Sequence, residues 1–314
     1  MKLYLAPMEG ITTYVYRNAL EKHYGGIDKY FTPFLTASHL KGRELREVHP
    51  DNNAGLNVVP QILTNDAELF VTITRQLADL GYREVNLNLG CPSGTVVSKG
   101  RGSGFLDRTE ELDKFLYEIY DANDGLKLSV KTRIGMEFES EWEDILEIYK
   151  KYPISELIIH PRLRSDFYSG KIRIDAYNMA KTVLGDKMPI VYNGDITNLE
   201  SYRERADEEC VMIGRGVIMN PELPGDIKNF GGAGSEIPAD LDQKADRMRL
   251  KAFLKDITEG YLVEMAGEKQ VVMKMKELWT YLSMGLKIDK KQLKAIHKAT
   301  HLSEYKSAVQ MILY

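Results

Sequence analysis

Chemically capable side chains recur along the first two-thirds of the chain, each time at or near the end of a short apolar run. The residues that share this placement are Pro7, Met8, Gln61, Asn88, Cys91, Lys131, Arg133, His160, Asn193, Gly194, Asp195, Gly214 and Arg215. They include a thiol, an ammonium group, guanidinium groups and an imidazole, which are groups that proton transfer and anion binding require. We therefore expect one site assembled from many segments.

Cys91 is the strongest candidate for acid–base or nucleophilic chemistry. It lies between Gly90 and Pro92, where the proline fixes the turn and the glycine lets the backbone bend. No second cysteine or histidine lies at the spacing of a zinc site, so we expect no metal. The alternative for Cys91 is a buried inert thiol, which is our expectation for Cys210 because it opens an apolar run.

Lys131 is the one charged residue inside the apolar run Leu-Ser-Val-Lys-Thr before Arg133. An unpaired buried lysine is costly, so it requires an anionic or electron-rich partner. The negatively charged N1–C2=O edge of a reduced flavin is such a partner. A salt bridge to Asp195 or Glu9 is the alternative.

Two glycine-containing segments predict a phosphate site. Asn193-Gly-Asp and Ile213-Gly-Arg-Gly follow the last two apolar runs of the first two-thirds of the chain. Their glycines allow close approach of the backbone, and Arg215 supplies a guanidinium for a dianion. Two tight turns without a ligand are the alternative.

The segments that carry these residues predict a parallel barrel. Eight short runs are nearly continuously apolar, which is typical of strands buried on both faces. The runs span residues 3–8, 30–35, 56–63, 84–89, 126–132, 156–160, 188–192 and 210–214. The amphipathic stretches between them predict helices at 66–80, 109–123, 140–151 and 174–184. We expect Asn65 and Asp107 as N-caps and Gly81 as a C-cap.

Eight alternations within about 215 residues favour a closed (β/α)8 TIM barrel over a doubly wound open sheet. In such a barrel the active site lies at the carboxyl ends of the strands, which is where the candidate residues lie. The fold class is therefore α/β, with the site at the barrel mouth.

The last quarter of the chain is predicted to be a small helical domain. Residues 225–238 include GGAGSEIP, which predicts a linker, and residues 240–314 show no strand pattern. Two apolar faces at helical spacing are expected, made by Leu250, Leu254, Ile257 and Tyr261 and by Val271, Met275, Leu278 and Leu282. We divide the chain into a barrel domain, 1–232, and a helical domain, 233–314.

Charge is distributed unevenly along the 314 residues. The net charge is −4, which argues against a nucleic-acid binder that acts by bulk charge. Residues 240–314 nevertheless carry 14 Lys and Arg against 10 Asp and Glu, a net charge of +4. A mildly basic tail on an acidic body suggests contact with a polyanion, and a solvated helical face is the alternative.

Composition and missing motifs exclude several classes. With 43% hydrophobic and 28% charged residues, the chain is an ordinary globular protein without an apolar run long enough to span a membrane. Two cysteines make no disulfide framework, so we expect a cytoplasmic protein. The phosphate-loop, HExxH and GxSxG patterns are absent, which disfavours triphosphate hydrolysis, zinc peptidase and serine hydrolase activities.

The motifs together resemble those of the tRNA-dihydrouridine synthases, FMN-dependent enzymes that reduce specific uridines in tRNA. The similar segments cover essentially the whole chain: APMEGIT, TPFLTASHL, VVPQIL, NLNLGCPSGTVVSKGRGSGFL, VKTRIG, HPRLRSDFYSG, VYNGDI, VMIGRGVIMNPEL and KMKELWTYL. The combination of the NxGCP segment with the later succession of VKTRIG, histidine, NGD and IGRG is specific, whereas each piece alone is not.

The resemblance implies a role for each candidate residue. FMN would be held by Pro7, Met8, Gln61, Lys131, His160, Asn193, Gly194, Asp195, Gly214 and Arg215, with Gly214 and Arg215 at its phosphate. Asn88 and Arg133 would contact the target uracil, and Cys91 would donate the proton. NADPH, or NADH, would be the reductant, tRNA the substrate, and the helical domain a clamp on tRNA. No membrane association is expected, and we expect a monomer.

Two other functions remain open at this point. A flavin barrel similar to dihydroorotate dehydrogenase, acting on a free pyrimidine, would share the barrel, the phosphate site and a cysteine near the flavin. A non-catalytic tRNA-binding barrel protein is the second alternative. The basic helical tail favours a tRNA substrate over a free pyrimidine, and a yellow purified protein would favour an enzyme.

Overall fold

A sheet of nine short parallel strands is the central element of the computed structural model, which describes residues 1–123, 125–230, 243–286 and 288–313. The strands follow one another in the order β3-β2-β1-β9-β8-β7-β6-β5-β4. Their bounds are Lys2–Leu5 (β1), Lys29–Phe31 (β2), Val58–Val59 (β3), Gln61–Ile62 (β4), Glu84–Leu89 (β5), Lys127–Arg133 (β6), Leu157–His160 (β7), Ile190–Asn193 (β8) and Cys210–Ile213 (β9).

The strands β3 and β4 occupy one strand position, because they are separated only by Pro60, which has no N–H to donate to a ladder. β3 pairs with β2, and β4 pairs with β5, so the sheet runs through eight positions and returns to its starting point. The predicted (β/α)8 TIM barrel with additional C-terminal helices is therefore confirmed, as a nearly closed barrel.

All eight predicted strand positions are occupied, and two strands, β1 and β2, end three and four residues before the predicted runs do. β1 ends at Leu5, because the chain turns at Met8, whose carbonyl oxygen accepts the amides of Ile11 and Thr12. β2 ends at Phe31, two residues before Pro33, and beyond it Leu35 forms only an isolated bridge to Ile62.

Two compact units make up the chain, and we treat each by itself. The barrel unit comprises residues 1–7, 29–194 and 208–212, and the helical unit comprises 8–28, 195–207 and 213–314. The predicted boundary between residues 232 and 233 lies outside the described residues.

The interior of the barrel is apolar in the middle and charged toward the amino ends of its strands. Inward-facing side chains form one buried cluster: Tyr4, Ala6, Phe31, Val59, Ile158, Val191, Cys210 and Met212. Near the amino ends, the Lys29 ammonium contacts the carboxylates of Glu84 at 3.1 Å and Glu156 at 3.2 Å. Burial raises the pKa of the Cys210 thiol to about 12, in keeping with the expected inert core cysteine.

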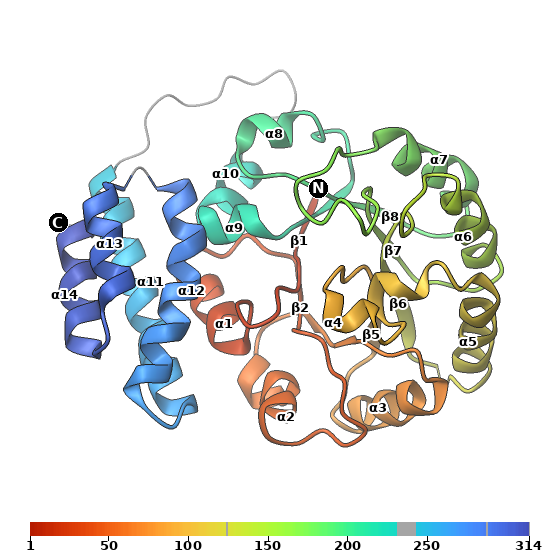
Figure 1. Ribbon diagram of the computed structural model, residues 1–314, viewed down its shortest axis with the longest axis horizontal. Helices are drawn as coiled ribbons and strands as arrows, with labels where there is room; N and C mark the ends of the chain where they lie inside the picture. Colours follow the sequence, from red (N-terminus) through yellow and green to blue (C-terminus); the bar gives the residue numbers. More distant parts are fainter. Residues whose placement is uncertain (124, 231–242, 287, 314) are drawn as a thin grey trace. The chain divides into compact units, whose positions relative to one another are not determined.

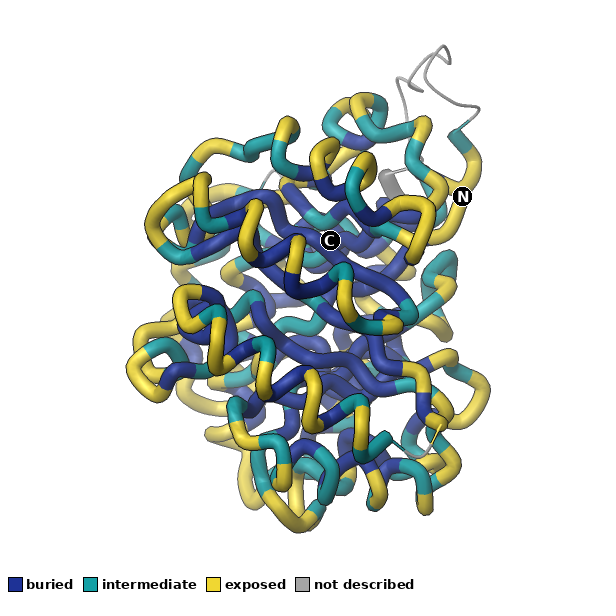
Figure 2. The backbone as a smooth tube through the Cα atoms, turned by 90° about the vertical axis from the view of Figure 1, so that its right-hand side faces the viewer, coloured by how far each residue is buried: buried dark blue, intermediate teal, exposed yellow. Residues whose placement is uncertain are grey.

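Helices of the barrel unit surround these strands (Figure 1). They are α2 (Gly42–Val48), α3 (Ala67–Asp79), α4 (Gly94–Val97), α5 (Thr109–Asp121), α6 (Glu141–Tyr149), α7 (Ile174–Leu184) and the 3₁₀ helices η1 (Pro50–Asn53) and η2 (Gly102–Phe105). Each turn of these helices has a buried side and an exposed side (Figure 2), as amphipathic sequences require.

The predicted N-caps were wrong by one residue. Asp66, not Asn65, caps α3 by accepting the Leu69 amide at 3.0 Å, because the Asn65 side chain is bonded to Lys99 and Arg101. Arg108, not Asp107, precedes α5 and makes no side-chain cap bond; acidic residues in the first turn of that helix interact with its dipole instead.

Gly81 lies one residue beyond the C-cap of α3, which is Leu80, so the predicted C-cap was also one residue off. Gly81 has φ +93°, a conformation that favours glycine, and the Tyr82 amide bonds back to the Leu77 carbonyl oxygen.

The helical unit contains α1 (Tyr14–His23), α8 (Leu199–Arg203), α9 (Arg215–Met219), α10 (Leu223–Asn229), α11 (Gln243–Glu264), α12 (Glu268–Gly285), α13 (Lys290–Lys298) and α14 (Leu302–Leu313). The two predicted apolar faces are confirmed, since all eight of their residues are buried on α11 and α12.

The predicted linker at 225–238 was wrong in its first residues. The helix α10 begins at Leu223 with Pro224 in its first turn and continues through Gly225, and the buried Ile227 anchors it. Residues 231–242 of the linker lie outside the described residues.

Candidate active site

Strand register brings polar side chains together at the carboxyl end of the barrel. Gln61 of β4 pairs with Asn86 of β5, and Asn88 of β5 pairs with Lys131 of β6. Arg133 of β6 pairs with His160 of β7. Because parallel strands end at the same edge, five predicted site residues lie on four neighbouring strands at this mouth.

A chain of amide side chains runs through this part of the mouth. The Gln61 Nε2 donates to Asn86 Oδ1 at 2.8 Å, and the Gln61 Oε1 accepts from Asn88 Nδ2 at 2.7 Å. The Asn88 Oδ1 then accepts the backbone amides of Gly90 and Cys91, each at 3.0 Å. Asn88, predicted to contact uracil, is thus also the anchor of the loop that carries Cys91.

Cys91 is partly exposed, is not in a disulfide, and lies against a glycine-containing loop. Ser103 donates its amide and its hydroxyl to the Cys91 carbonyl oxygen, at 3.1 and 2.8 Å. Gly102 has φ +57°, and a Cβ there would lie 2.9 Å from that oxygen and 3.0 Å from the Cys91 Cβ. The Gly100–Gly104 stretch therefore supports the cysteine.

Lys131 has no carboxylate or hydrogen-bond partner within the described part of the barrel unit, so its ammonium group is left without an anion there. Burial is the main cause that lowers its pKa to about 7; the Arg133 charge lowers it further, and the nearby Cys91 opposes this. Asp195, one predicted alternative partner, accepts from Arg215 instead. A group with this environment favours a bound anion.

The Arg133 side chain forms hydrogen bonds to the backbone of two loops. Its guanidinium donates to the carbonyl oxygens of Gly90 at 3.0 Å, Leu163 at 2.8 Å and Phe167 at 2.6 Å. The residue is only 1% exposed, and burial lowers its pKa to about 10. Its predicted contact with uracil stays a prediction, while its role in joining the loops after β5 and β7 is visible.

His160 is buried and carries two neighbours that the sequence did not assign to the site. Its Nε2 lies 3.3 Å from Arg162 Nη1, and its ring stacks on Tyr168 at 6.4 Å between centroids. Tyr168 is exposed and also packs against the Arg133 guanidinium. Tyr168 could have been assigned to the site from the sequence, because it is an aromatic residue in a loop rich in arginine.

The remaining barrel-unit candidates are Pro7, Asn193 and Gly194. Pro7 lies two residues beyond the end of β1. The Asn193 Nδ2 donates to the Met212 carbonyl oxygen at 2.8 Å, which ties β8 to β9. A Cβ on Gly194 would lie 2.9 Å from the Tyr192 hydroxyl, so a larger residue here would have to displace that side chain.

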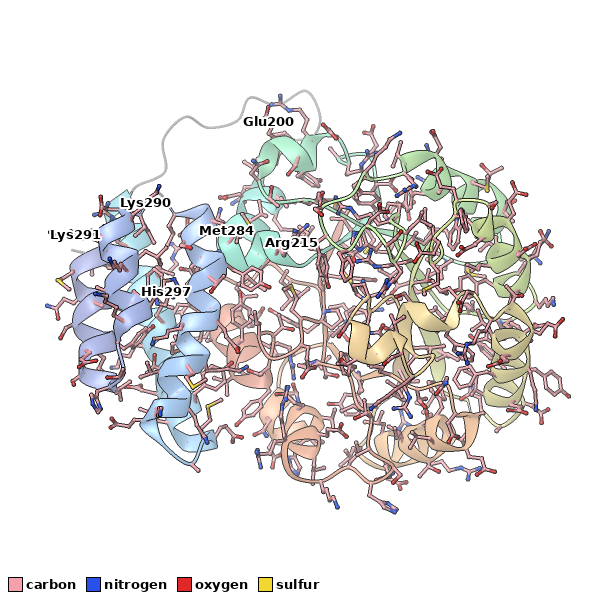
Figure 3. All side chains as sticks on the ribbon, in the orientation of Figure 1. Glu200, Arg215, Met284, Lys290, Lys291 and His297 are labelled. Carbon is pink, nitrogen blue, oxygen red and sulfur yellow. The ribbon has the colours of Figure 1, made fainter. Side chains whose placement is uncertain are left out.

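The helical unit holds the candidates Met8, Asp195, Gly214 and Arg215. Met8 forms the turn that precedes α1. Gly214 precedes α9, and Arg215 is its first residue; the Arg215 Nη2 donates to Asp195 Oδ1 at 2.6 Å (Figure 3). A Cβ on Gly216 would lie 2.1 Å from the Ile196 carbonyl oxygen, so the glycine is needed for this close packing.

The helix α13 carries an exposed basic face, which includes Lys290, Lys291 and His297 (Figure 3). Lys294 and Lys298 are exposed on the same helix, which has no acidic residue within its bounds. Among the described residues, none of these four lysines forms an ion pair. This face is free to attract a polyanion.

The described residues contain neither a metal-binding cluster nor a membrane-spanning helix. No group of three or more histidine, cysteine, aspartate or glutamate side chains there is arranged to bind a metal ion. No helix within those ranges combines the length and apolarity required to cross a membrane.

The family model and the similar curated proteins all point to the same family. The family model described as dihydrouridine synthase matches residues 4–311. A probable tRNA-dihydrouridine synthase of Staphylococcus epidermidis is 32% identical over 229 residues, covering 69% of each chain. The probable tRNA-dihydrouridine synthase 2 of Bacillus subtilis is 28% identical over 234 residues, again covering 69% of each chain.

Solved structures share the fold at low sequence identity. A variant of NCR from Zymomonas mobilis has a TM-score of 0.52 at 13% identity, covering 76% of this chain and 89% of that one. Morphinone reductase has a TM-score of 0.52 at 11% identity, covering 76% and 88%. These likenesses support the barrel architecture.

Proposed function

Since this chain belongs to the dihydrouridine synthase family, we propose that it reduces specific uridines in tRNA to 5,6-dihydrouridine, with FMN as cofactor and NADPH, or NADH, as reductant. The observation that carries the proposal is the half-buried Lys131 ammonium, which has no anionic partner among the described residues of the barrel unit and lies near Cys91. A cationic group next to a thiol at a barrel mouth suits a redox cofactor and a proton donor.

The residues present fit a flavin. A reduced isoalloxazine carries negative charge at its N1–C2=O edge, and Lys131 would neutralise that charge. Gln61 retains an amide hydrogen that the amide chain does not use, and His160 completes the polar lining. Pro7, Met8, Asn193, Gly194 and Asp195 keep their predicted roles as further cofactor contacts.

Gly214 and Arg215 are proposed to bind the FMN phosphate. In many TIM barrels the loops after the last two strands bind phosphate through backbone amides. Arg215 would exchange the Asp195 carboxylate for the phosphate dianion, which accepts more and stronger hydrogen bonds.

Cys91 is the proposed proton donor. When bound, FMN supplies the hydride that reduces C6 of the uracil. The Cys91 thiol holds the proton that C5 receives and is positioned by the bonds from Asn88 and Ser103. Asn88 and Arg133 are proposed to orient the ring and to stabilise the charge that develops on its carbonyl oxygens.

The target base has to leave its stack before any of these groups can reach it. The exposed lysines of α13 are proposed to bind the tRNA backbone, because phosphates are the matching polyanion and these lysines have no acidic partners among the described residues. Binding to tRNA should therefore weaken as salt is added.

One assay separates this function from its alternatives. Purified chain, FMN and NADPH are incubated with unmodified tRNA or with free orotate or uracil. Dihydrouridine in tRNA supports the proposal, whereas turnover of the free pyrimidine alone supports an enzyme similar to dihydroorotate dehydrogenase. A colourless protein that binds tRNA without converting it supports a non-catalytic role.

A further inference from the structure

Two buried side chains below the mouth, Asn86 and Ser129, have no role in the site as described so far. Both are fully buried, and both contact the amide chain that ends at Cys91. The Asn86 Nδ2 donates to Ser129 Oγ at 3.0 Å, and the Ser129 hydroxyl donates to the Val85 carbonyl oxygen at 3.2 Å. This chain of hydrogen bonds therefore begins at the Val85 carbonyl oxygen and ends at the backbone amides of Gly90 and Cys91.

The backbone groups at the two ends fix the direction of every bond between them. A backbone carbonyl oxygen can only accept, so the Ser129 hydroxyl that bonds to Val85 must donate. Its oxygen then accepts from Asn86, which turns the Asn86 Oδ1 toward the Gln61 Nε2. At the other end, backbone amides can only donate, so the Asn88 Oδ1 must face Gly90 and Cys91. The backbone groups at both ends therefore require the same donor-to-acceptor direction along the whole chain of hydrogen bonds.

This polarity limits what Asn88 can offer a ligand. Both lone pairs of its Oδ1 are occupied by the Gly90 and Cys91 amides, and one Nδ2 hydrogen is donated to Gln61. One N–H donor remains and no acceptor, because an amide side chain has two of each. Asn88 therefore matches a carbonyl oxygen, as in uracil, and mismatches an amino group.

We propose that Asn86 and Ser129 are positioning residues that fix the polarity of this chain, and so hold the Cys91 loop and present Asn88 as a donor. The inference rests on the proposed function for its meaning in catalysis, but the bonds themselves can be tested without turnover. Neither residue contacts the Cys91 loop directly; each acts through Gln61 and Asn88.

Two nearly isosteric substitutions of Asn86 separate polarity from packing. Asn86→Leu removes the acceptor for Gln61. Asn86→Asp keeps an oxygen facing Gln61, since an aspartate accepts there in either protonation state. Amide hydrogen exchange of Gly90 and Cys91, read by NMR on the full deuterated chain as purified, should be about tenfold faster in Asn86→Leu, as loss of one buried hydrogen bond implies. Exchange in Asn86→Asp should stay within about threefold of wild type.

Thr74→Val is the matched control, because the buried Thr74 hydroxyl also donates to a backbone carbonyl oxygen, at 2.8 Å, but lies in α3. It should leave the Gly90 and Cys91 amides unchanged. The amides of Ile158 and Ile159 in β7 report global opening and should be unaffected in every variant.

The outcomes distinguish this inference from the proposed function. Wild-type exchange at Gly90 and Cys91 in Asn86→Leu overturns the inference, as does equal loss of protection in the Asp and Leu variants. If the exchange results are as expected, kcat for uridine reduction should fall about tenfold in Asn86→Leu, with the KM for tRNA little changed. Wild-type protein that forms no dihydrouridine refutes the proposed function, while the exchange data still decide the role of Asn86.

Discussion

Asn88 and Lys131 are register partners across β5 and β6, so an amide with one free donor and an ammonium without an anion occupy neighbouring positions at the barrel mouth. Such a pair is unfavourable in the free protein, because the half-buried Lys131 charge has no carboxylate partner among the described residues. The Asn88–Lys131 pair becomes favourable when an electron-rich ligand binds, because the ligand then compensates the ammonium charge. The mouth is thus built for a ligand with anionic character and carbonyl oxygens.

Lys131 should make the stability of the flavin-free protein depend on pH. Its pKa is about 7 in the folded chain and 10.5 when unperturbed, so the unfolded chain binds more protons between these values. The residue therefore adds stability as pH rises from about 7 toward 10.5, and this gain is lost again as pH falls from 10.5 to about 7. Urea unfolding of wild type and Lys131→Met should show a difference that changes between about pH 6.5 and about pH 9.5.

Bound FMN should weaken this pH dependence, because an anion near Lys131 raises its pKa. A difference between wild type and Lys131→Met that stays constant across the range would mean that the ammonium is not desolvated. The same result with and without FMN would place the cofactor elsewhere.

Cys91→Ala should purify yellow but convert uridine at least about 100-fold more slowly, because a positioned general acid is removed while the cofactor contacts remain. Flavin absorbance and mass analysis of the tRNA measure the two effects. Cys210→Ala is the control, since that thiol is buried in the barrel core, and conversion should continue. Normal turnover by Cys91→Ala would assign the proton to another group.

Arg215→Ala should lower FMN affinity by about tenfold or more, because a charge-assisted contact to the phosphate is lost. Equilibrium titration of the flavin-free protein with FMN measures this. Arg249→Ala in the same unit removes an arginine from a comparable exposed ion pair, with Glu222, and should bind FMN as wild type does. Equal affinity in all three proteins would contradict the phosphate assignment.

Charge reversal at Lys290, Lys291 and Lys294 should raise the tRNA dissociation constant and reduce the slope of its logarithm against log salt by about 2 to 3. Reduction of bound flavin by NADPH should be unchanged. Reversal of Lys114, Lys127 and Lys187, exposed lysines of the barrel unit, controls for net charge. If both triple variants weaken tRNA binding equally, α13 has no special role.

The barrel was predictable because each parallel strand is buried on both faces and so appears as a short apolar run. The run at 84–89 matches β5 residue for residue, and the faces of α11 and α12 follow directly from helical spacing. Strand ends near Pro33 and Pro60 were less predictable, since pairing partners decide how far a strand extends.

The candidate residues were predictable by type and position, whereas their partners were not. The sequence shows that Arg133 lies near a strand end, but not that three carbonyl oxygens occupy its guanidinium. Asn86 and Ser129 look like satisfied core polar residues until the register places Asn86 between Gln61 and Ser129. Hydrogen bonds between segments far apart in the chain depend on that register, which no local pattern encodes.

The most direct test of the account is mass mapping of tRNA after incubation with the purified chain, FMN and NADPH. We expect a uridine that gains two hydrogens at defined positions in wild-type reactions, and no gain with Cys91→Ala. Unmodified tRNA after incubation with a fully flavin-loaded, NADPH-reducible wild-type protein would contradict the central claim.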